Sequence, residues 1–156
     1  MSKNGKVTID DLTKFRDVLE QNLNEQQIDE FIQMCSKELA ARLLAKVIKR
    51  TPVGQYSKSS GKKGGTLRRG WTNGKAQAAH QYAQNLKVHS YGGVYVIEII
   101  NPVEYAEYVE FGHRTRNHEG WVEGQFFLTI SEQEIEKDAP RVLTNKLNKF
   151  LKECFT

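Results

Sequence analysis

Two glutamates and two histidines lie close together in the second half of the chain, and their side chains are of types that bind metals. Glu110, His113, His118 and Glu119 fall within ten residues of one another. Imidazole and carboxylate ligands in this number would suit zinc or manganese. Their spacing matches no established metal-binding motif, however. We therefore interpret them as solvated loop side chains and expect no metal and no cofactor.

The glycines and serines of residues 54–65 form no catalytic pattern either. Gly61, Gly64 and Gly65 are not followed by the lysine and serine or threonine that complete a phosphate-binding loop. The serines in this stretch do not lie in a nucleophile-elbow sequence. We therefore assign no catalytic residue and predict that the protein is not an enzyme.

Six basic residues lie between positions 58 and 75, and no acidic residue lies among them. They are Lys58, Lys62, Lys63, Arg68, Arg69 and Lys75. Flexible cations bind nucleic-acid phosphates through charge alone and read no sequence. Only Tyr56 and Trp71 flank them, so the segment lacks the interleaved aromatics of a base-stacking surface. A phosphate contact and a charged loop without a ligand both stay open.

Three aromatic residues, Tyr105, Tyr108 and Phe111, occur within seven residues beside several glutamates. Their helical spacing favours a place in the core, where they would seat a short helix on a sheet. Tyrosine and phenylalanine also concentrate binding energy at interfaces. The sequence allows either role.

Length and composition are those of one ordinary domain. The chain has 156 residues, of which 38% are hydrophobic and 27% charged, with a net charge of +4. No apolar run approaches the roughly 20 residues that span a bilayer. The N-terminal segment lacks the apolar centre of a signal peptide, so we expect the protein to stay in the cytoplasm where it is made. Cys35 and Cys154 are then expected to be small buried side chains or inert thiols, although a bridge between them stays open.

Helical patterns dominate both ends of the chain. The first is predicted over residues 10–21, and a longer one begins after Asn24 as its cap and ends at Thr51, before Pro52. A final helix is predicted over residues 126–155, with Pro140 kinking or interrupting it.

The middle of the chain predicts a flexible loop and a small sheet. Residues 54–65 are rich in Gly, Ser and Lys and are predicted to be a mobile basic insertion. Residues 82–89 and 94–101 read as two strands joined by a turn at 90–93. Residues 103–111 then predict a short helix ended by Gly112, and 113–124 a polar loop. The fold class is α+β, a small antiparallel sheet packed by a long N-terminal helix and a C-terminal helix in a single domain, 1–156.

Two sequence motifs resemble those of the phage head–tail joining family, also called neck or tail-completion proteins. The first is TPVG at 51–54 followed by GGTLRRGW at 64–71, here separated by the insertion QYSKSSGKK. The second is NPVEYAEYVEFG at 101–112, and GWVEGQFFL at 120–128 continues the family order without its usual arginine–proline. The resemblance spans nearly the whole chain.

The resemblance implies a virion structural protein that forms a ring, often hexameric, between the portal and the tail. Its partners would be further copies of itself, the neighbouring head-connector and tail-tube or tail-terminator proteins, and DNA passing through the lumen. The basic loop then becomes a lumen-facing or docking arm, with Lys58, Lys62, Lys63, Arg68 and Arg69 as contacts. The subunit-interface candidates are Tyr105, Tyr108, Glu110, Phe111, Arg114 and Arg116, with Glu110 expected to pair with an arginine of another chain. The protein would be found in the virion neck or tail, and in the host cytoplasm during assembly.

A rival interpretation is a small nucleic-acid-binding module that ignores sequence and has no virion role. It predicts salt-sensitive affinity of the isolated monomer for duplex DNA. The joining protein predicts rings instead.

Overall fold

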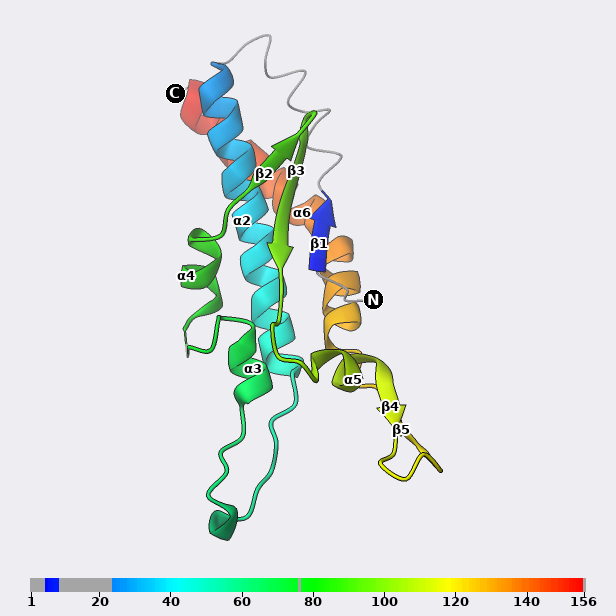
Figure 1. Cartoon of the computed structure of the whole chain (residues 1–156). Coiled ribbons are helices and arrows are strands. Elements are labelled where there is room, and N and C mark those ends of the chain that lie inside the picture. The colour runs from blue at the N-terminus through cyan, green and yellow to red at the C-terminus, as the bar shows by residue number, and fades with distance from the viewer. Residues whose placement is uncertain (1–4, 9–23, 76, 156) are drawn as a thin grey trace.

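Helix α2, Glu25–Arg50, runs through the middle of the computed structural model, which describes residues 5–8, 24–75 and 77–155 (Figure 1). The Asn24 side chain caps its first turn by accepting a 2.8 Å hydrogen bond from the backbone N–H of Gln26. The helix ends at Thr51, whose backbone N–H still bonds to the Val47 carbonyl. Both predicted limits of this helix are confirmed. The helix predicted over residues 10–21 lies outside the described residues.

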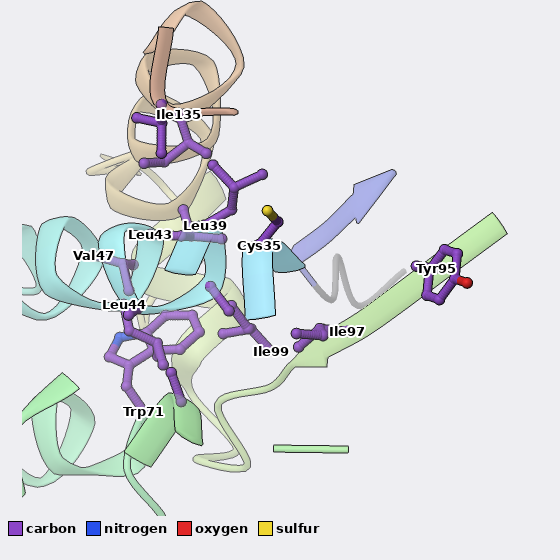
Figure 2. Close-up of a cluster of buried hydrophobic side chains, with 14 of the residues drawn as sticks. Cys35, Leu39, Leu43, Leu44, Val47, Trp71, Tyr95, Ile97, Ile99 and Ile135 are labelled. Atoms are coloured by element: carbon purple, nitrogen blue, oxygen red, sulfur yellow. The ribbon is translucent and has the colours of Figure 1, made fainter. Parts of the chain in front are cut away.

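The core is built around α2, which is buried on several sides. Figure 2 shows that Cys35, Leu39 and Leu43 lie toward Ile135 of the last helix, while Leu44 and Val47 lie toward Trp71. The buried residues of α2 are Ile28, Phe31, Ile32, Cys35, Ser36, Leu39, Ala40, Ala41, Leu43, Leu44 and Val47. A helix buried on so much of its circumference must be surrounded by other elements, and this requirement sets the architecture.

A three-stranded antiparallel sheet covers one side of α2. Its central strand is β3, Val94–Ile99, paired with β1, Gly5–Thr8, on one edge and with β2, His89–Tyr91, on the other. Residues 5 and 99 are partners in the first pairing, and residues 91 and 94 in the second. Alternate residues of β3, Tyr95, Ile97 and Ile99, join the core around α2.

The strand predicted over residues 82–89 is wrong in most of its length. Residues Ala79–Gln84 form helix α4, and β2 begins only at His89. The helix forms because Ala83 packs completely buried into the core around α2, and the Lys37 ammonium of α2 donates to the Gln84 carbonyl at its end. Tertiary packing of a small side chain therefore overrides a short alternation of apolar residues.

The segment between α2 and α3 projects away from the body of the molecule, and we call residues 54–65 the basic arm (Figure 1). A short 3-10 helix, η1, Lys58–Ser60, forms its tip, and helix α3, Thr66–Gly70, follows its return to the body. The two sides of the arm touch at its root, where Gly64 lies against Gly54 and Val53 so closely that a side chain would not fit. The mobility predicted for this segment stays a prediction.

The predicted short helix is α5, Ala106–Phe111, and Gly112 ends it at a φ of 87° as expected. The polar loop predicted over residues 113–124 instead contains a two-stranded hairpin, β4, Gly112–Arg114, and β5, Trp121–Glu123. Its turn is closed by local hydrogen bonds between Thr115 and Gly120. Such short strands pair through contacts that their composition does not reveal.

Helix α6, Phe127–Phe155, lies antiparallel to α2 and completes the core. Phe31 and Phe150 stack at one end of the pair, with ring centroids 4.3 Å apart, and Arg50 and Lys46 pair with Glu134 at the other. The helix continues through Pro140, so of the two predicted effects an interruption is wrong, and a kink stays a prediction. The α+β class with a small antiparallel sheet and two long helices is confirmed. Within the described residues, no helix is long and apolar enough to cross a bilayer.

Candidate functional site

The two halves of the first motif meet in a junction at the end of α2. Thr51 is fully buried, and its hydroxyl donates to the Val47 carbonyl at 2.5 Å and accepts a 2.8 Å hydrogen bond from the indole N–H of Trp71. The Arg68 guanidinium donates to the Thr51 carbonyl at 2.8 Å. The residues before and after the basic arm are thus held together independently of the arm.

The second motif is attached to the same junction through Asn101. Its side-chain amide donates to the Leu67 carbonyl at 2.7 Å, and its side-chain oxygen accepts from the backbone N–H of Val103 at 3.1 Å. The same oxygen lies so close to Gly70 that no side chain could replace the hydrogen there. The start of the α5 segment is therefore fixed against α3 by a backbone-to-side-chain contact that needs both Asn101 and Gly70.

Glu110 links α5 to the beginning of α6. Only 4% of its surface is exposed, and its carboxylate accepts hydrogen bonds from the backbone N–H groups of Leu128 and Thr129, each 2.9 Å long, and from the Thr129 hydroxyl at 2.6 Å. A carboxylate at this position satisfies unpaired donors and opposes the positive end of the helix dipole. The expectation that Glu110 is available for an ion pair with another chain is therefore corrected, because the group is used inside the monomer.

The link between α5 and α6 is reciprocal. The carbonyls of Val109 and Glu110, at the end of α5, accept from the backbone N–H groups of Gln125 and Phe126 at 2.8 and 3.0 Å. Phe126 adopts a φ of 48°, a conformation that costs a non-glycine residue about 1 kcal/mol or more. The structure thus holds an aromatic residue in an unfavourable backbone conformation directly before α6.

Large apolar side chains are exposed on the α5 segment, on the β4–β5 hairpin and at the start of α6. Among the described residues, seven of the eleven exposed large hydrophobic side chains fall between residues 105 and 130. They are Tyr105, Tyr108, Phe111, Trp121, Val122, Phe126 and Ile130. We call these seven residues the aromatic face. Their concentration on one segment is of the kind that marks an interaction site.

Two ring contacts hold aromatic side chains of this face, one between two of its members and one with a histidine of the hairpin. The rings of Phe111 and Phe126 meet edge to face, with centroids 6.3 Å apart, and Tyr108 meets His113 in the same way at 5.8 Å. Tyr108 is 58% exposed and Trp121 is 55% exposed. Tyr105, Tyr108 and Phe111 are therefore exposed and not part of the core, and their role at an interface stays a prediction. Trp121, Val122, Phe126 and Ile130 were not among the predicted candidates.

A pocket of about 220 Å³ opens beside the aromatic face, between α3, α5 and the start of α6. Trp71, Val103 and Phe127 supply apolar lining, and the exposed carboxylates Glu104 and Glu107 line it as well. Trp71 and Phe127 meet edge to face at 5.9 Å, so this wall is part of the core. An apolar interior with two accessible carboxylates favours a ligand group that carries positive charge.

The five predicted basic contacts separate into two groups. Lys58, Lys62 and Lys63 are exposed on the basic arm. Arg68 and Arg69 are half-buried, with Arg68 bound to the Thr51 carbonyl and Arg69 donating to the Gly64 carbonyl at 3.3 Å. Of the five residues, therefore, the two arginines have a structural role in the body of the molecule and the three lysines do not.

The remaining candidates lie on the hairpin. Arg114 is exposed on β4, and Arg116 is exposed in the loop that follows. His118 adopts a φ of 58° within the same loop. In the part of the chain that the structure describes, no three His, Cys, Asp or Glu side chains come close enough to hold a metal ion.

A protein-family model matches the region that contains both motifs. The model of the HK97-gp10-like family, described as "Bacteriophage HK97-gp10, putative tail-component", matches residues 13–112. The chain belongs to this family. No curated protein and no solved structure matches it.

Membership of the HK97-gp10-like family confirms the predicted kinship with phage head–tail and tail-completion proteins, and it supports a structural role in the virion tail. The matched region contains α2, α3 and α5 together with Thr51, Trp71, Asn101 and Glu110. The junction, in which residues of both motifs contact one another, therefore lies inside the matched region. The aromatic face begins inside the match and extends beyond it.

Proposed function

We propose that this phage tail component forms an oligomeric ring at the junction of head and tail, where it helps complete the tail or join it to the capsid. The aromatic face carries this proposal. It exposes seven large apolar side chains on α5, the hairpin and the start of α6. Full burial of a side chain of this size contributes about 1.5–3 kcal/mol, and these half-exposed side chains would contribute a part of that on burial in a contact. A protein surface is therefore its natural partner.

The charges around the aromatic face are of both signs, since Arg114 and Arg116 are exposed on the hairpin, and it is the exposed glutamates of the α5 segment that argue for protein rather than nucleic acid. Glu104 and Glu107 lie exposed on the α5 segment, where they would repel phosphate groups. The exposed lysines of the basic arm lie elsewhere, with Tyr56 as the exposed large aromatic residue among them. A nucleic-acid module of the rival kind would combine cations and stacking aromatics on one surface.

The proposed ring has three kinds of neighbour. Further copies of the chain would form the ring, head-connector proteins and tail-tube or tail-terminator proteins would contact its two ends, and DNA would pass through its lumen. Such a protein needs no cofactor and performs no catalysis. It would assemble in the host cytoplasm before it joins the neck or tail of the virion.

The aromatic face can be tested by truncating two of its members. We expect the purified chain to form rings visible by negative-stain electron microscopy and to sediment as a discrete oligomer. Tyr108→Ala combined with Phe111→Ala should shift it to monomers, whereas Tyr91→Ala, which truncates an equally exposed tyrosine on β2, should not. Urea unfolding measures whether the monomer itself stays folded.

Two results would contradict the proposal. One is a double variant that assembles normally and loses only stability, which would mean that Tyr108 and Phe111 contribute nothing to the contact between copies. The other is a wild-type chain that stays monomeric in solution and in phage particles and binds duplex DNA with a steep salt dependence. The latter result would favour the nucleic-acid-binding module.

A further inference from the structure

The basic arm is an appendage whose charges have no counterpart within it. It leaves the body between α2 and α3 and extends well beyond both helices (Figure 1). Lys58, Lys62 and Lys63 are exposed on it, and residues 54–65 contain no acidic residue. The Lys62 ammonium lies over the Tyr56 ring, 5.9 Å from its centre, and the residue is exposed. The arm therefore presents positive charge at a distance from the body.

The pocket beside α5 has the complementary character. Its wall includes the apolar side chains of Val103, Phe111 and Phe127, and Glu104 and Glu107 are its exposed carboxylates. A long basic side chain fits such a site, because its methylene groups bury against apolar atoms while its charged end stays near the opening. Glu110, which also lines the pocket, is already bound to the start of α6 and does not take part.

We propose that the basic arm of one copy docks on the next copy, with a lysine of the arm in the pocket beside α5, its ammonium against Glu104 and Glu107. This inference rests on the proposed ring and names the contact that closes it. The second copy is the favoured occupant because one chain carries both complementary surfaces. Every copy in a ring then donates one arm and receives one.

The placement of the two surfaces allows a head-to-tail contact if the arm, which extends beyond the level of α3 and α5, bends toward the neighbouring copy (Figure 1). The arm and the α5 segment with its hairpin lie toward the same end of the long helices but on different sides of the molecule (Figure 1). Rotation about an axis roughly parallel to those helices keeps both surfaces at the same end in every copy. Head-to-tail contacts between two different surfaces form a ring when the rotation between copies closes, and a helical filament when it does not.

Charge reversal tests the contact. One variant changes Lys58, Lys62 and Lys63 to Glu, and a second changes Glu104 and Glu107 to Lys. Each alone should raise the dissociation constant of the ring about tenfold or more, because like charges then face each other at every contact. A matched control changes three exposed lysines outside the arm to Glu, namely Lys87, Lys137 and Lys149.

Mixing the two variants gives the decisive result. In an equimolar mixture, each arm meets a pocket of opposite charge if the two variants alternate around the ring. Analytical ultracentrifugation should therefore show assembly restored in the mixture, and also in a single chain that carries all five substitutions. Failure of both to recover assembly, or equal loss in the control, would overturn the proposal.

Cysteine cross-linking in phage particles tests it without relying on assembly in solution. Lys62→Cys and Glu107→Cys are placed together in a Cys154→Ser chain, and a short bis-maleimide is added. Cys35 does not interfere because it is completely buried and burial raises the pKa of its thiol to about 12. A ladder of covalent oligomers is expected from the double variant, and no ladder from either single variant.

The alternative occupants give different patterns. An arm that folds onto its own pocket gives an internal cross-link without a ladder, and an arm that binds another tail protein or DNA gives no link between copies. Either pattern overturns the inference. If rings still form and the Tyr108 and Phe111 variant still abolishes them, the proposed function survives that failure. If neither rings nor a ladder is found, both fail.

Discussion

The indole N–H of Trp71 donates a 2.8 Å hydrogen bond to the hydroxyl of Thr51, twenty residues earlier in the chain. Both side chains are buried, and the same hydroxyl reaches back to the Val47 carbonyl at the end of α2. The bond joins the two motif halves that the basic arm separates. It gives a physical reason for threonine before proline and for tryptophan after the glycine of the second half.

Replacing Thr51 with Val should leave the Trp71 N–H buried without an acceptor. We expect the free energy of unfolding to fall by about 1–3 kcal/mol, which is the cost of such an unpaired group. Thr144→Val is the matched control, because Thr144 makes the same kind of bond to the carbonyl four residues earlier but is exposed. Urea denaturation of both variants provides the comparison, and equal effects would show that the Trp71 bond contributes nothing.

Glu110→Ala should destabilise the monomer by about 2 kcal/mol, because three donors at the start of α6 lose a charged acceptor. Glu107→Ala, on the same helix but exposed, should change stability by less than about 0.5 kcal/mol. Thermal unfolding followed by circular dichroism would separate the two. A stable Glu110→Ala protein that fails only to oligomerise would restore the interchain role first expected of this residue.

Phe126 gives a prediction about backbone conformation. At its φ of 48°, glycine is unstrained whereas alanine is not, so Phe126→Gly should be more stable than Phe126→Ala by about 1 kcal/mol. Both variants remove the ring that meets Phe111, so both should weaken assembly equally. Chemical denaturation tests the first statement and sedimentation the second. An alanine variant as stable as the glycine variant would show that the residue is not strained in solution.

Glu134 makes stability depend on pH. Hydrogen bonds from Arg50 and then Lys46 lower the pKa of its carboxyl below the ordinary value of 4.5. A group with a lowered pKa in the folded state stabilises the protein above its unfolded pKa and loses that contribution as pH falls through the folded one. Stability should therefore drop below about pH 4.5, and less so in Glu134→Gln. Glu136→Gln, an exposed neighbour, controls for the loss of one charge.

Cys35 reports on opening of the core. Its side chain is completely buried beside α6, and burial raises the pKa of the thiol to about 12. In a Cys154→Ser chain at pH 8, alkylation by iodoacetamide should be slow and should accelerate with urea in parallel with global unfolding. Rapid labelling without denaturant would mean that α2 and α6 separate locally.

Sequence reasoning worked where the determinants are local. The start of α2 follows from the Asn24 cap and its end from Pro52, and Gly112 ends α5 as predicted. It failed where a contact between residues far apart in the sequence determines the secondary structure. Strand β1 is four residues long and pairs with residues 88 to 94 positions later, and α4 forms because Ala83 fits into the core.

The candidate site shows the same division. The aromatic residues at 105, 108 and 111 were identifiable from composition, but only the fold shows that they are exposed and joined by Trp121 and Phe126. The position of Glu110 in the sequence does not distinguish it from an exposed helix residue, because its burial depends on α6 beginning beside it. Likewise, the sequence did not distinguish Arg68, which binds the Thr51 carbonyl, from the free lysines of the arm.

The close contact of Gly54 and Gly64 at the root of the basic arm also affects how the sequence of this tail component can vary. Because the junction holds both ends of the arm in place, the residues between them can lengthen or shorten at a small entropic cost, about 0.6 kcal/mol for each doubling of the loop. Related phages could thus carry arms of different length on an unchanged body. The same position would accept an inserted peptide tag.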